Sequence, residues 1–252
     1  MNLRQRHFVL TFGRSGSSLL CAILADAGAD FALPVPASWD PRHGIMEHPQ
    51  IKQAAHHMRR AFDIDAGRRF VIAPRIEAGI RRRRARRHLC RALEAAAYVK
   101  IGDLDLLVQM AFALGYSPRV LLNLRRFEDC LASTLVGRKH HGPDSLAVDY
   151  ARICRQGLAL MQTFGGCVVS YEDLLGGSEA AWIPAAATVT GLDADALRRA
   201  ARQRVNAPVH GPANVAVVYG ECRTLYETLS ALNGRVFEPS APVCRALESR
   251  QN

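Results

Sequence analysis

Short apolar runs alternate along the chain with longer stretches in which apolar residues recur at helical spacing. The short runs are rich in β-branched and aromatic residues and predict strands over residues 8–12, 97–101, 119–124 and 167–170. The helical spacing predicts helices over residues 17–27, 49–62, 80–96, 104–114, 128–136, 145–164, 194–203 and 219–232. Asp193 is expected to cap the helix that starts at residue 194, and Asp144 or Ser145 the helix that ends near residue 164.

The alternation of strands and helices predicts an α/β fold. Successive parallel strands are joined by crossover helices that lie on the faces of the sheet. We therefore expect a central, mostly parallel sheet of four or five strands that is flanked by helices. One domain is expected over residues 1–252, with a core over 7–176 and a mainly helical C-terminal segment over 177–252.

The composition indicates a chain that can bury a full core without disulfides. Hydrophobic residues make up 49% of its 252 residues. The seven cysteines are odd in number and scattered, with no C-x-x-C pair, so we expect reduced and mostly buried thiols. The N-terminal apolar run stops at Gly13, too early for a signal peptide, and no uncharged stretch approaches the roughly 18 to 20 residues of a transmembrane segment. A soluble, cytoplasmic protein is expected.

A formal net charge of +10 permits nucleic acid, an acidic membrane surface or a polyanionic small molecule as the partner, and charge alone does not choose among them. Much of the excess lies in the arginine run 81–87, and such runs usually form a solvated helix face. No aromatic residues are interleaved with these arginines and no nucleic-acid module is recognisable, so we expect no nucleic-acid partner. A non-enzymatic module that binds a polyanion through this run is kept as an alternative.

The loop between the first predicted strand and helix reads Arg14-Ser15-Gly16-Ser17-Ser18. Backbone N–H groups and a helix N-terminus converge there, which favours a phosphate or a similar anion. Gly16 carries no Cβ to block a close approach, the serines offer hydroxyl donors, and Arg14 adds a permanent charge. The loop is not a Walker A motif, because Ser18 and Leu19 stand where that motif has Gly and Lys. The alternative is an ordinary turn with a serine cap.

A second polar feature follows the third predicted strand, where Arg125 ends the strand and Ser133 lies on the succeeding helix. Ligands of parallel sheets bind beyond the carboxyl ends of the strands, so Arg125 and the first loop should open toward the same crevice. Both residues could then face one phosphate. A salt bridge between Arg126 and Glu128 at the start of the helix is a structural alternative.

These two features, with Val99-Lys100 between them and Ser170-Tyr171-Glu172-Asp173-Leu174 after them, resemble the bacterial-type sulfotransferases that use 3′-phosphoadenosine-5′-phosphosulfate (PAPS). The resemblance covers residues 8–175 and implies a P-loop NTPase-like fold. It implies that the donor's 5′-phosphosulfate is held by Arg14, Ser15, Gly16, Ser17 and Ser18. It further implies that Arg125 and Ser133 bind the 3′-phosphate and that Tyr171 lies near the adenine. Gly13 stands where the family usually has proline.

The resemblance also implies that Lys100 is a second cation, beside Arg14, acting on the sulfuryl group or the leaving phosphate. Many eukaryotic members place a histidine base two residues after this lysine, and Gly102 stands there instead. Residues 44–49 resemble the Gly-x-x-Glu segment of bacterial members, which makes Glu47 the first candidate for the general base. His48 is the second candidate, and Asp103 is another. A solvated Lys100 and a helix-capping Glu47 are the structural alternatives.

We therefore expect an enzyme that transfers a sulfuryl group from PAPS to a hydroxyl or amine and releases 3′,5′-adenosine bisphosphate. The acceptor could be a small molecule, a lipid or a glycan, and its pocket is expected within residues 29–62 and 139–144 and parts of the C-terminal region. A P-loop-like nucleotide or small-molecule kinase is the alternative enzyme. The adjacent His140 and His141 lack a suitably spaced carboxylate, so no metal site is expected. A homodimer is compatible with the sequence.

Overall fold

The computed structural model describes residues 4–34, 46–67, 72–102, 105–137, 142–176, 180–205 and 219–248. The strands in this part of the chain are β1 (Gln5–Thr11), β2 (Tyr98–Ile101), β3 (Ser117–Leu124), β4 (Gly166–Ser170) and β5 (Val236–Phe237). The helices are α1 (Ser17–Asp26), α2 (Pro49–Gly67), α3 (Ile72–Ala95), α4 (Asp105–Ala113), α5 (Phe127–Gly137), α6 (Pro143–Phe164), α7 (Tyr171–Leu175), α8 (Trp182–Thr190), α9 (Ala194–Arg204), α10 (Gly220–Ser230) and α11 (Ala241–Glu248).

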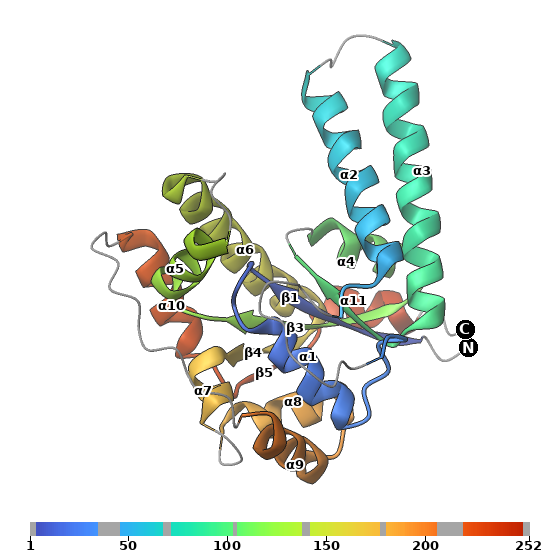
Figure 1. Ribbon diagram of the computed structural model, residues 1–252. Coiled ribbons are helices and arrows are strands. Elements are labelled where there is room, and N and C mark those ends of the chain that lie inside the picture. Colours follow the sequence, from blue (N-terminus) through green and yellow to red (C-terminus); the bar gives the residue numbers. More distant parts are fainter. Residues whose placement is uncertain are drawn as a thin grey trace.

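A five-stranded sheet of order β2-β1-β3-β4-β5 forms the centre of the molecule (Figure 1). The first four strands pair in parallel, and β5 pairs antiparallel with β4. The α/β fold with a mostly parallel sheet, predicted from the alternation of apolar runs, is therefore confirmed. Each of the four predicted strands is present, with ends that differ by a few residues.

The two faces of the sheet are covered by separate apolar clusters. Successive side chains of a strand point to opposite faces, and in β1 the buried Phe8 and Leu10 join one cluster while Val9 joins the other. The first cluster packs against α3, α4, α6 and α10, and the second against α1, α8 and α9. The strands are buried on both faces, which explains why they read as continuous apolar runs.

The C-terminal part of the chain contributes to the sheet and to the core. The sequence predicted mainly helices after residue 177, whereas the structure adds the two-residue strand β5 to the edge of the sheet. Trp182 on α8 is fully buried in the second apolar cluster. Neither β5 nor α8 was predicted, because two residues give no measurable period and the alanine-rich α8 has few large apolar residues that repeat.

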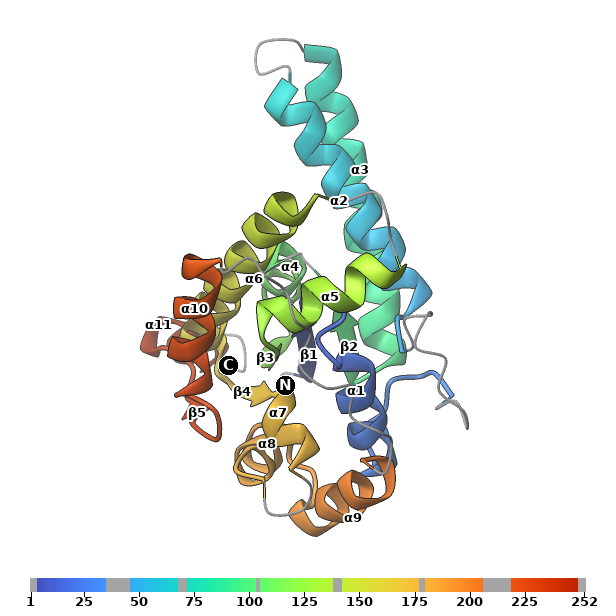
Figure 2. The ribbon, with the colours of Figure 1, turned by 60° about the vertical axis from the view of Figure 1, so that its left-hand side comes forward.

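The helices α2 and α3 form a long antiparallel hairpin that extends away from the rest of the described chain (Figures 1 and 2). Both run beyond their predicted bounds. Five of the six arginines in the run 81–87 are exposed on α3, and Ala85 within it is buried against α2. The run therefore lies on a solvated helix face, as predicted.

Of the two predicted helix caps, one is confirmed and the other is wrong. The Asp193 carboxylate accepts a hydrogen bond from the N–H of Ala196 and caps α9, as expected. The expected cap of α6 at Asp144 or Ser145 is wrong, since α6 begins at Pro143 with Gly142 as its N-cap. Proline suits this first helical position because its fixed φ is already helical and its missing N–H has no partner there.

The expectation of reduced and mostly buried thiols is confirmed. All seven cysteines are free thiols, and five of them are buried. In the described ranges no helix combines the length and the apolar character that crossing a bilayer requires.

We predict that His7 makes the stability of the fold depend on pH. His7 is buried in β1, stacked on the Tyr98 ring with centroids 4.3 Å apart, and burial lowers its pKa to about 4, with Arg119 and Arg6 adding repulsion. Because an unfolded histidine has a pKa near 6.5, the unfolded state binds the proton first as pH falls. The free energy of unfolding should drop by roughly 3 kcal/mol between pH 6.5 and pH 4.

Urea unfolding of the wild type and of His7→Phe across this pH range measures the effect. Phenylalanine keeps the ring on Tyr98 and cannot take up a proton, so its stability should fall less steeply with acid. Equal slopes for the two proteins would show that His7 is not the buried titrating group.

Candidate active site

The switch point of the sheet lies between the carboxyl ends of β1 and β3. The chain runs from β1 to β2 on one side and later returns to β3 on the other, so the connections after β1 and β3 diverge there. Thr11 and Asn123 are paired in register at these two strand ends. Parallel α/β sheets bind their ligands at this kind of switch point. The two polar features recognised in the sequence therefore lie side by side.

The loop after β1 turns sharply into α1. Arg14 and Gly16 both adopt positive φ angles, of 67° and 84°, and Gly16 is the N-cap of α1. Gly16 accepts hydrogen bonds from the N–H groups of Leu19 and Leu20. The N–H groups of Ser17 and Ser18 begin the helix, where no intrahelical acceptor exists for them. These N–H groups and the positive end of the helix dipole make the loop a suitable anion site.

Ser15 anchors the loop to the sheet. Its hydroxyl is buried and hydrogen-bonds with the Thr11 hydroxyl, and the Asn123 amide donates to the Ser15 carbonyl at 2.8 Å. These bonds attach the loop to both strand ends at once. The Ser15 side chain therefore lies beneath the loop, and its backbone is the part that can face a bound anion.

Tyr171 contacts the loop from the end of β4. It begins α7, directly after β4, and its ring lies against Gly16 where a Cβ would otherwise stand. The Arg125 guanidinium lies over the same ring, 4.4 Å from its centroid. Such a cation–π contact is worth on the order of 1 kcal/mol and fixes the orientation of both groups. The ring thus joins the first loop to the residue that follows β3.

Arg14, Arg125 and Ser133 form one connected group. The Arg14 Nε donates to the Ser133 hydroxyl at 2.9 Å, and Arg125 donates to the Arg14 carbonyl at 3.1 Å. The Nε of Arg125 is buried and has no hydrogen-bond partner among the described residues. A buried guanidinium donor without an acceptor is costly unless an anion completes it. The salt bridge considered between Arg126 and Glu128 does not explain this group, since Arg126 lies over the Tyr226 ring.

The Lys100 side chain extends from β2 to Ser18 at the start of α1. It is 6% exposed, and its Nζ donates to the Ser18 hydroxyl at 3.0 Å. Burial lowers the pKa of Lys100, an effect that Cys21 and Glu47 oppose. The alternative of a solvated lysine is therefore wrong. A buried ammonium beside the anion loop stabilises negative charge much more strongly than one in water.

Glu47 lies next to this lysine, just before α2. One carboxylate oxygen is 4.0 Å from the Lys100 Nζ, and the other is 2.8 Å from the Lys52 Nζ. The preceding Met46 is buried with a positive φ of 62°, a turn that directs the chain from the core toward α2. Glu47 thereby lies beside Lys100, and the first N–H groups of α2 bond to His48 rather than to Glu47.

The other two candidates for the base have different surroundings. His48 uses its Nδ1 to accept a hydrogen bond from the Gln50 N–H at the start of α2, and burial lowers the pKa of this histidine. Asp103 lies outside the described residues, as do His140 and His141. Elsewhere in the described chain no group of three His, Cys, Asp or Glu side chains could hold a metal ion.

The carboxylates of the Tyr-Glu-Asp-Leu segment have structural partners. Asp173 accepts from the Trp182 N–H and from the Asn233 amide, and Asn233 in turn accepts from the Ser170 N–H. Glu172 accepts from the Ser170 hydroxyl at 3.0 Å. Tyr171 is thus the member of the segment that contacts the loop.

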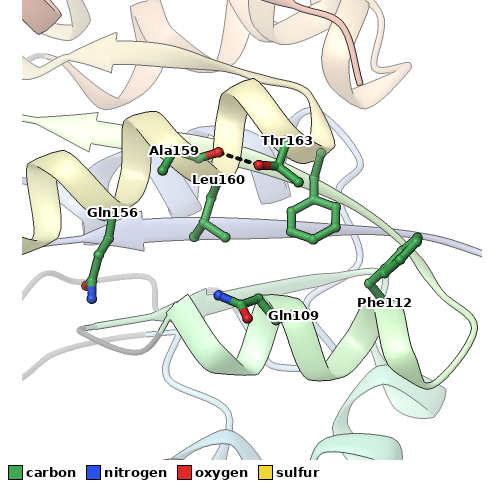
Figure 3. A pocket seen from close by; sticks show the side chains of 7 residues that line it. Gln109, Phe112, Gln156, Ala159, Leu160 and Thr163 are labelled. Atoms are coloured by element: carbon green, nitrogen blue, oxygen red, sulfur yellow. Dashed lines mark hydrogen bonds between the residues drawn. The ribbon is translucent and has the colours of Figure 1, made fainter. Parts of the chain in front are cut away.

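A cavity of about 470 Å³ lies elsewhere, between α4 and α6 (Figure 3). Phe112 and Phe164 line one end of it, near the helix ends that lead into the starts of β3 and β4. The starts of parallel strands lie at the edge opposite the loop from Arg14 to Ser18, so this cavity is separate from that loop.

Sequence reasoning missed Thr11, Asn123 and Lys52 as members of this site. Asn123 carried a signal that could have been used, because an amide at the end of an otherwise apolar strand needs a partner when it is buried. Thr11 resembles any β-branched strand residue. Lys52 lies beyond the segment whose pattern was recognised.

Two solved structures resemble this arrangement of elements. The sulfotransferase domain of the olefin synthase from Synechococcus PCC 7002 has a TM-score of 0.51 at 15% identity, and the match covers 91% of this chain and 95% of that domain. The sulfotransferase domain from the curacin biosynthetic pathway matches over 100% of this chain and 98% of its own at 12% identity, but its TM-score of 0.39 carries no weight. No family model and no curated protein matches the sequence. The chain therefore has the sulfotransferase fold that its motifs predicted.

We predict that Gly16→Ala disables the anion loop, whereas Gly13→Ala does not. A Cβ at Gly16 would collide with the Tyr171 ring at a φ that alanine rarely adopts, while a Cβ at Gly13 meets nothing within 4 Å. The affinity for inorganic pyrophosphate, measured by calorimetry, should fall about tenfold or more in Gly16→Ala and stay near the wild-type value in Gly13→Ala. Equal pyrophosphate affinities in the two variants would contradict the role of this loop in binding the anion.

Proposed function

We propose that the chain is a PAPS-dependent sulfotransferase that moves a sulfuryl group to a hydroxyl or amine of an acceptor. The observation that carries the proposal is the buried Lys100 ammonium, which is bonded to Ser18 in a loop that also presents Arg14 and a helix N-terminus. The loop and its neighbour on β2 thus supply three sources of positive potential, which supports an anionic donor. The sulfotransferase fold supports this interpretation.

The described residues fit both charged ends of such a donor. The loop from Arg14 to Ser18 would hold the 5′-phosphosulfate through backbone N–H groups and the hydroxyls of Ser17 and Ser18. Arg125 and Ser133 would hold the 3′-phosphate, and the buried Arg125 Nε without a partner supports this. Tyr171 would orient Arg125 and border the space for the adenine.

Sulfuryl transfer mainly requires positioning and charge stabilisation. The acceptor oxygen or nitrogen attacks the sulfur in line, the bond between sulfur and the bridging oxygen of the 5′-phosphate breaks, and 3′,5′-adenosine bisphosphate leaves. Negative charge grows on the bridging oxygen, and we assign its stabilisation to Lys100 and Arg14. A preorganised donor of this kind is typically worth about 10² to 10³ in rate.

Glu47 is our candidate for the group that takes the acceptor's proton. Its carboxylate lies 4.0 Å from the Lys100 Nζ, close to where the sulfuryl group would sit, whereas the His48 Nδ1 accepts a helix N–H. The acceptor itself could be a small molecule, a lipid or a glycan. Much of its expected pocket, residues 35–45 and 138–141, lies outside the described residues.

We predict that 3′,5′-adenosine bisphosphate binds without added metal and more tightly than 5′-AMP or ATP. Arg125→Gln should weaken the bisphosphate about 10- to 100-fold and change 5′-AMP affinity little, because a charge-assisted bond to the 3′-phosphate is lost. Arg126→Gln is the matched control, since Arg126 contacts Tyr226 rather than the loop. Calorimetric titration measures all three ligands.

Two outcomes would contradict this assignment. If Arg125→Gln lowered the affinities for 5′-AMP and for the bisphosphate equally, Arg125 would not be the residue that binds the 3′-phosphate. A Mg²⁺-dependent preference for ATP would favour a P-loop-like kinase in place of a sulfotransferase.

We also predict that Glu47→Gln slows the chemical step about 10² to 10⁴-fold and leaves donor affinity near the wild-type value. Single-turnover transfer from PAPS to an accepted alcohol or amine, followed as a function of pH, measures this step. Lys52→Gln is the control, because it removes the other partner of Glu47 and leaves the carboxylate in place. Retained turnover in Glu47→Gln would make His48 or Asp103 the better candidate.

A further inference from the structure

Tyr150 carries a hydroxyl group into the apolar core on one face of the sheet. The residue lies on α6, is 1% exposed and belongs to the first apolar cluster. Its ring packs against Phe12 and Phe127, with centroids 5.4 Å and 5.2 Å away. A phenylalanine would bury the same ring, and a hydroxyl in an apolar core costs free energy unless it is hydrogen-bonded. The packing of the ring therefore does not explain the hydroxyl.

This hydroxyl bonds to the backbone of the candidate site. It donates to the Arg125 carbonyl at 2.8 Å, and it also contacts the Cys154 thiol one turn further along α6. Burial raises the pKa of Tyr150 far above its usual range, so the hydroxyl stays protonated and remains a donor. The register between β3 and β4 ends at the pair of Leu124 and Ser170. The Arg125 carbonyl thus lies beyond the last strand pair, and Tyr150 takes the place of a strand partner.

The same peptide unit is held at its other end by α7. The N–H of Arg126, which shares this unit with the Arg125 carbonyl, makes a long hydrogen bond of 3.5 Å to the Glu172 carboxylate. Glu172 also bonds to the Ser170 hydroxyl at 3.0 Å and to the Tyr226 hydroxyl of α10. A bond at each end of a planar peptide unit fixes its orientation. The backbone of Arg125 is therefore held from α6 and from α7.

The Arg125 side chain is held at its guanidinium end as well. That group lies over the Tyr171 ring and donates to the Arg14 carbonyl, while its buried Nε has no hydrogen-bond partner among the described residues. With the backbone and the guanidinium both held, few rotamers remain for the chain between them. An anion that bonds to this Nε then orders little that is not already ordered, which favours its binding.

We propose that Tyr150 is a positioning residue for the 3′-phosphate of the donor: its hydroxyl holds the backbone of Arg125 so that the guanidinium can present its buried Nε to that phosphate. This inference rests on the proposed function. Tyr150 itself contacts neither donor nor acceptor and acts through Arg125. Because the 5′-phosphosulfate is assigned to the loop from Arg14 to Ser18, loss of the Tyr150 hydroxyl should weaken ligands that carry a 3′-phosphate and spare those that lack one.

Tyr150→Phe tests the proposal, because it removes the hydroxyl and keeps the buried ring. Its affinity for 3′,5′-adenosine bisphosphate, measured by calorimetry, should fall about three- to tenfold, the usual effect of one lost hydrogen bond. Its affinity for 5′-AMP should stay near the wild-type value. The ratio of the two affinities is the readout, since a general loss of stability would not weaken one nucleotide selectively.

Tyr98→Phe is the matched control. The Tyr98 hydroxyl also donates to a backbone carbonyl, that of Thr190 at 3.1 Å, and its ring is buried in the second apolar cluster. Tyr98 begins β2, at the edge of the sheet opposite the loop from Arg14 to Ser18. Both variants should lower the midpoint of thermal unfolding, because each loses a buried hydrogen bond. Only Tyr150→Phe should change the ratio of the two affinities.

A double variant tests whether Tyr150 acts through Arg125. In Arg125→Gln the guanidinium is absent, so adding Tyr150→Phe should lower the bisphosphate affinity no further. Additive losses in the double variant, or an unchanged ratio of affinities in Tyr150→Phe, would overturn the inference and leave the donor assignment intact. A wild type that binds the bisphosphate no more tightly than 5′-AMP would overturn the donor assignment, and this inference with it.

Discussion

The candidate site depends on how Ser15 is held between two strands. Its buried hydroxyl bonds to Thr11 at the end of β1, and its carbonyl accepts from Asn123 at the end of β3. A loop with two residues at positive φ has little conformational preference for this shape by itself. The attachment to both strand ends supplies it, so that the N–H groups at the start of α1 are oriented before any ligand arrives. Polar groups tied down in advance cost little reorganisation when charge develops.

The burial of Lys100 is the second constraint on the site, and it costs free energy. An ammonium withdrawn from water loses hydration, which is why its pKa falls. The Ser18 hydroxyl and the more distant Glu47 carboxylate offset part of that loss, and a bound anion would offset much more. The buried Arg125 Nε, which has no hydrogen-bond partner among the described residues, likewise favours an anion. Both features favour a ligand that carries negative charge at two places.

The sequence predicted the strands, the loop and the group around Arg125 because each leaves a local pattern. An apolar run bounded by glycine and polar residues reports a buried strand wherever it occurs. It could not predict that Ser15 turns inward or that Tyr171 lies on Gly16, since both depend on contacts between segments more than 100 residues apart. The edge strand β5 was missed for a similar reason: two residues become a strand only because β4 is already present beside them. The cap of α6 was misplaced because proline and aspartate compete for the first turn.

The support of Tyr171 gives the C-terminal segment an unexpected importance. The ring that lies on Gly16 begins α7, and α7 is fixed through Asp173 and Ser170 to Asn233, a residue just before β5. The C-terminal segment, which least resembles the sulfotransferase family in sequence, therefore supports the loop from Arg14 to Ser18, which most resembles it. A shortened chain that ended before residue 233 would keep every residue of the loop, yet it would lose the support behind it. The hydrogen bonds that support the loop thus extend to Asn233, far beyond the last recognisable motif.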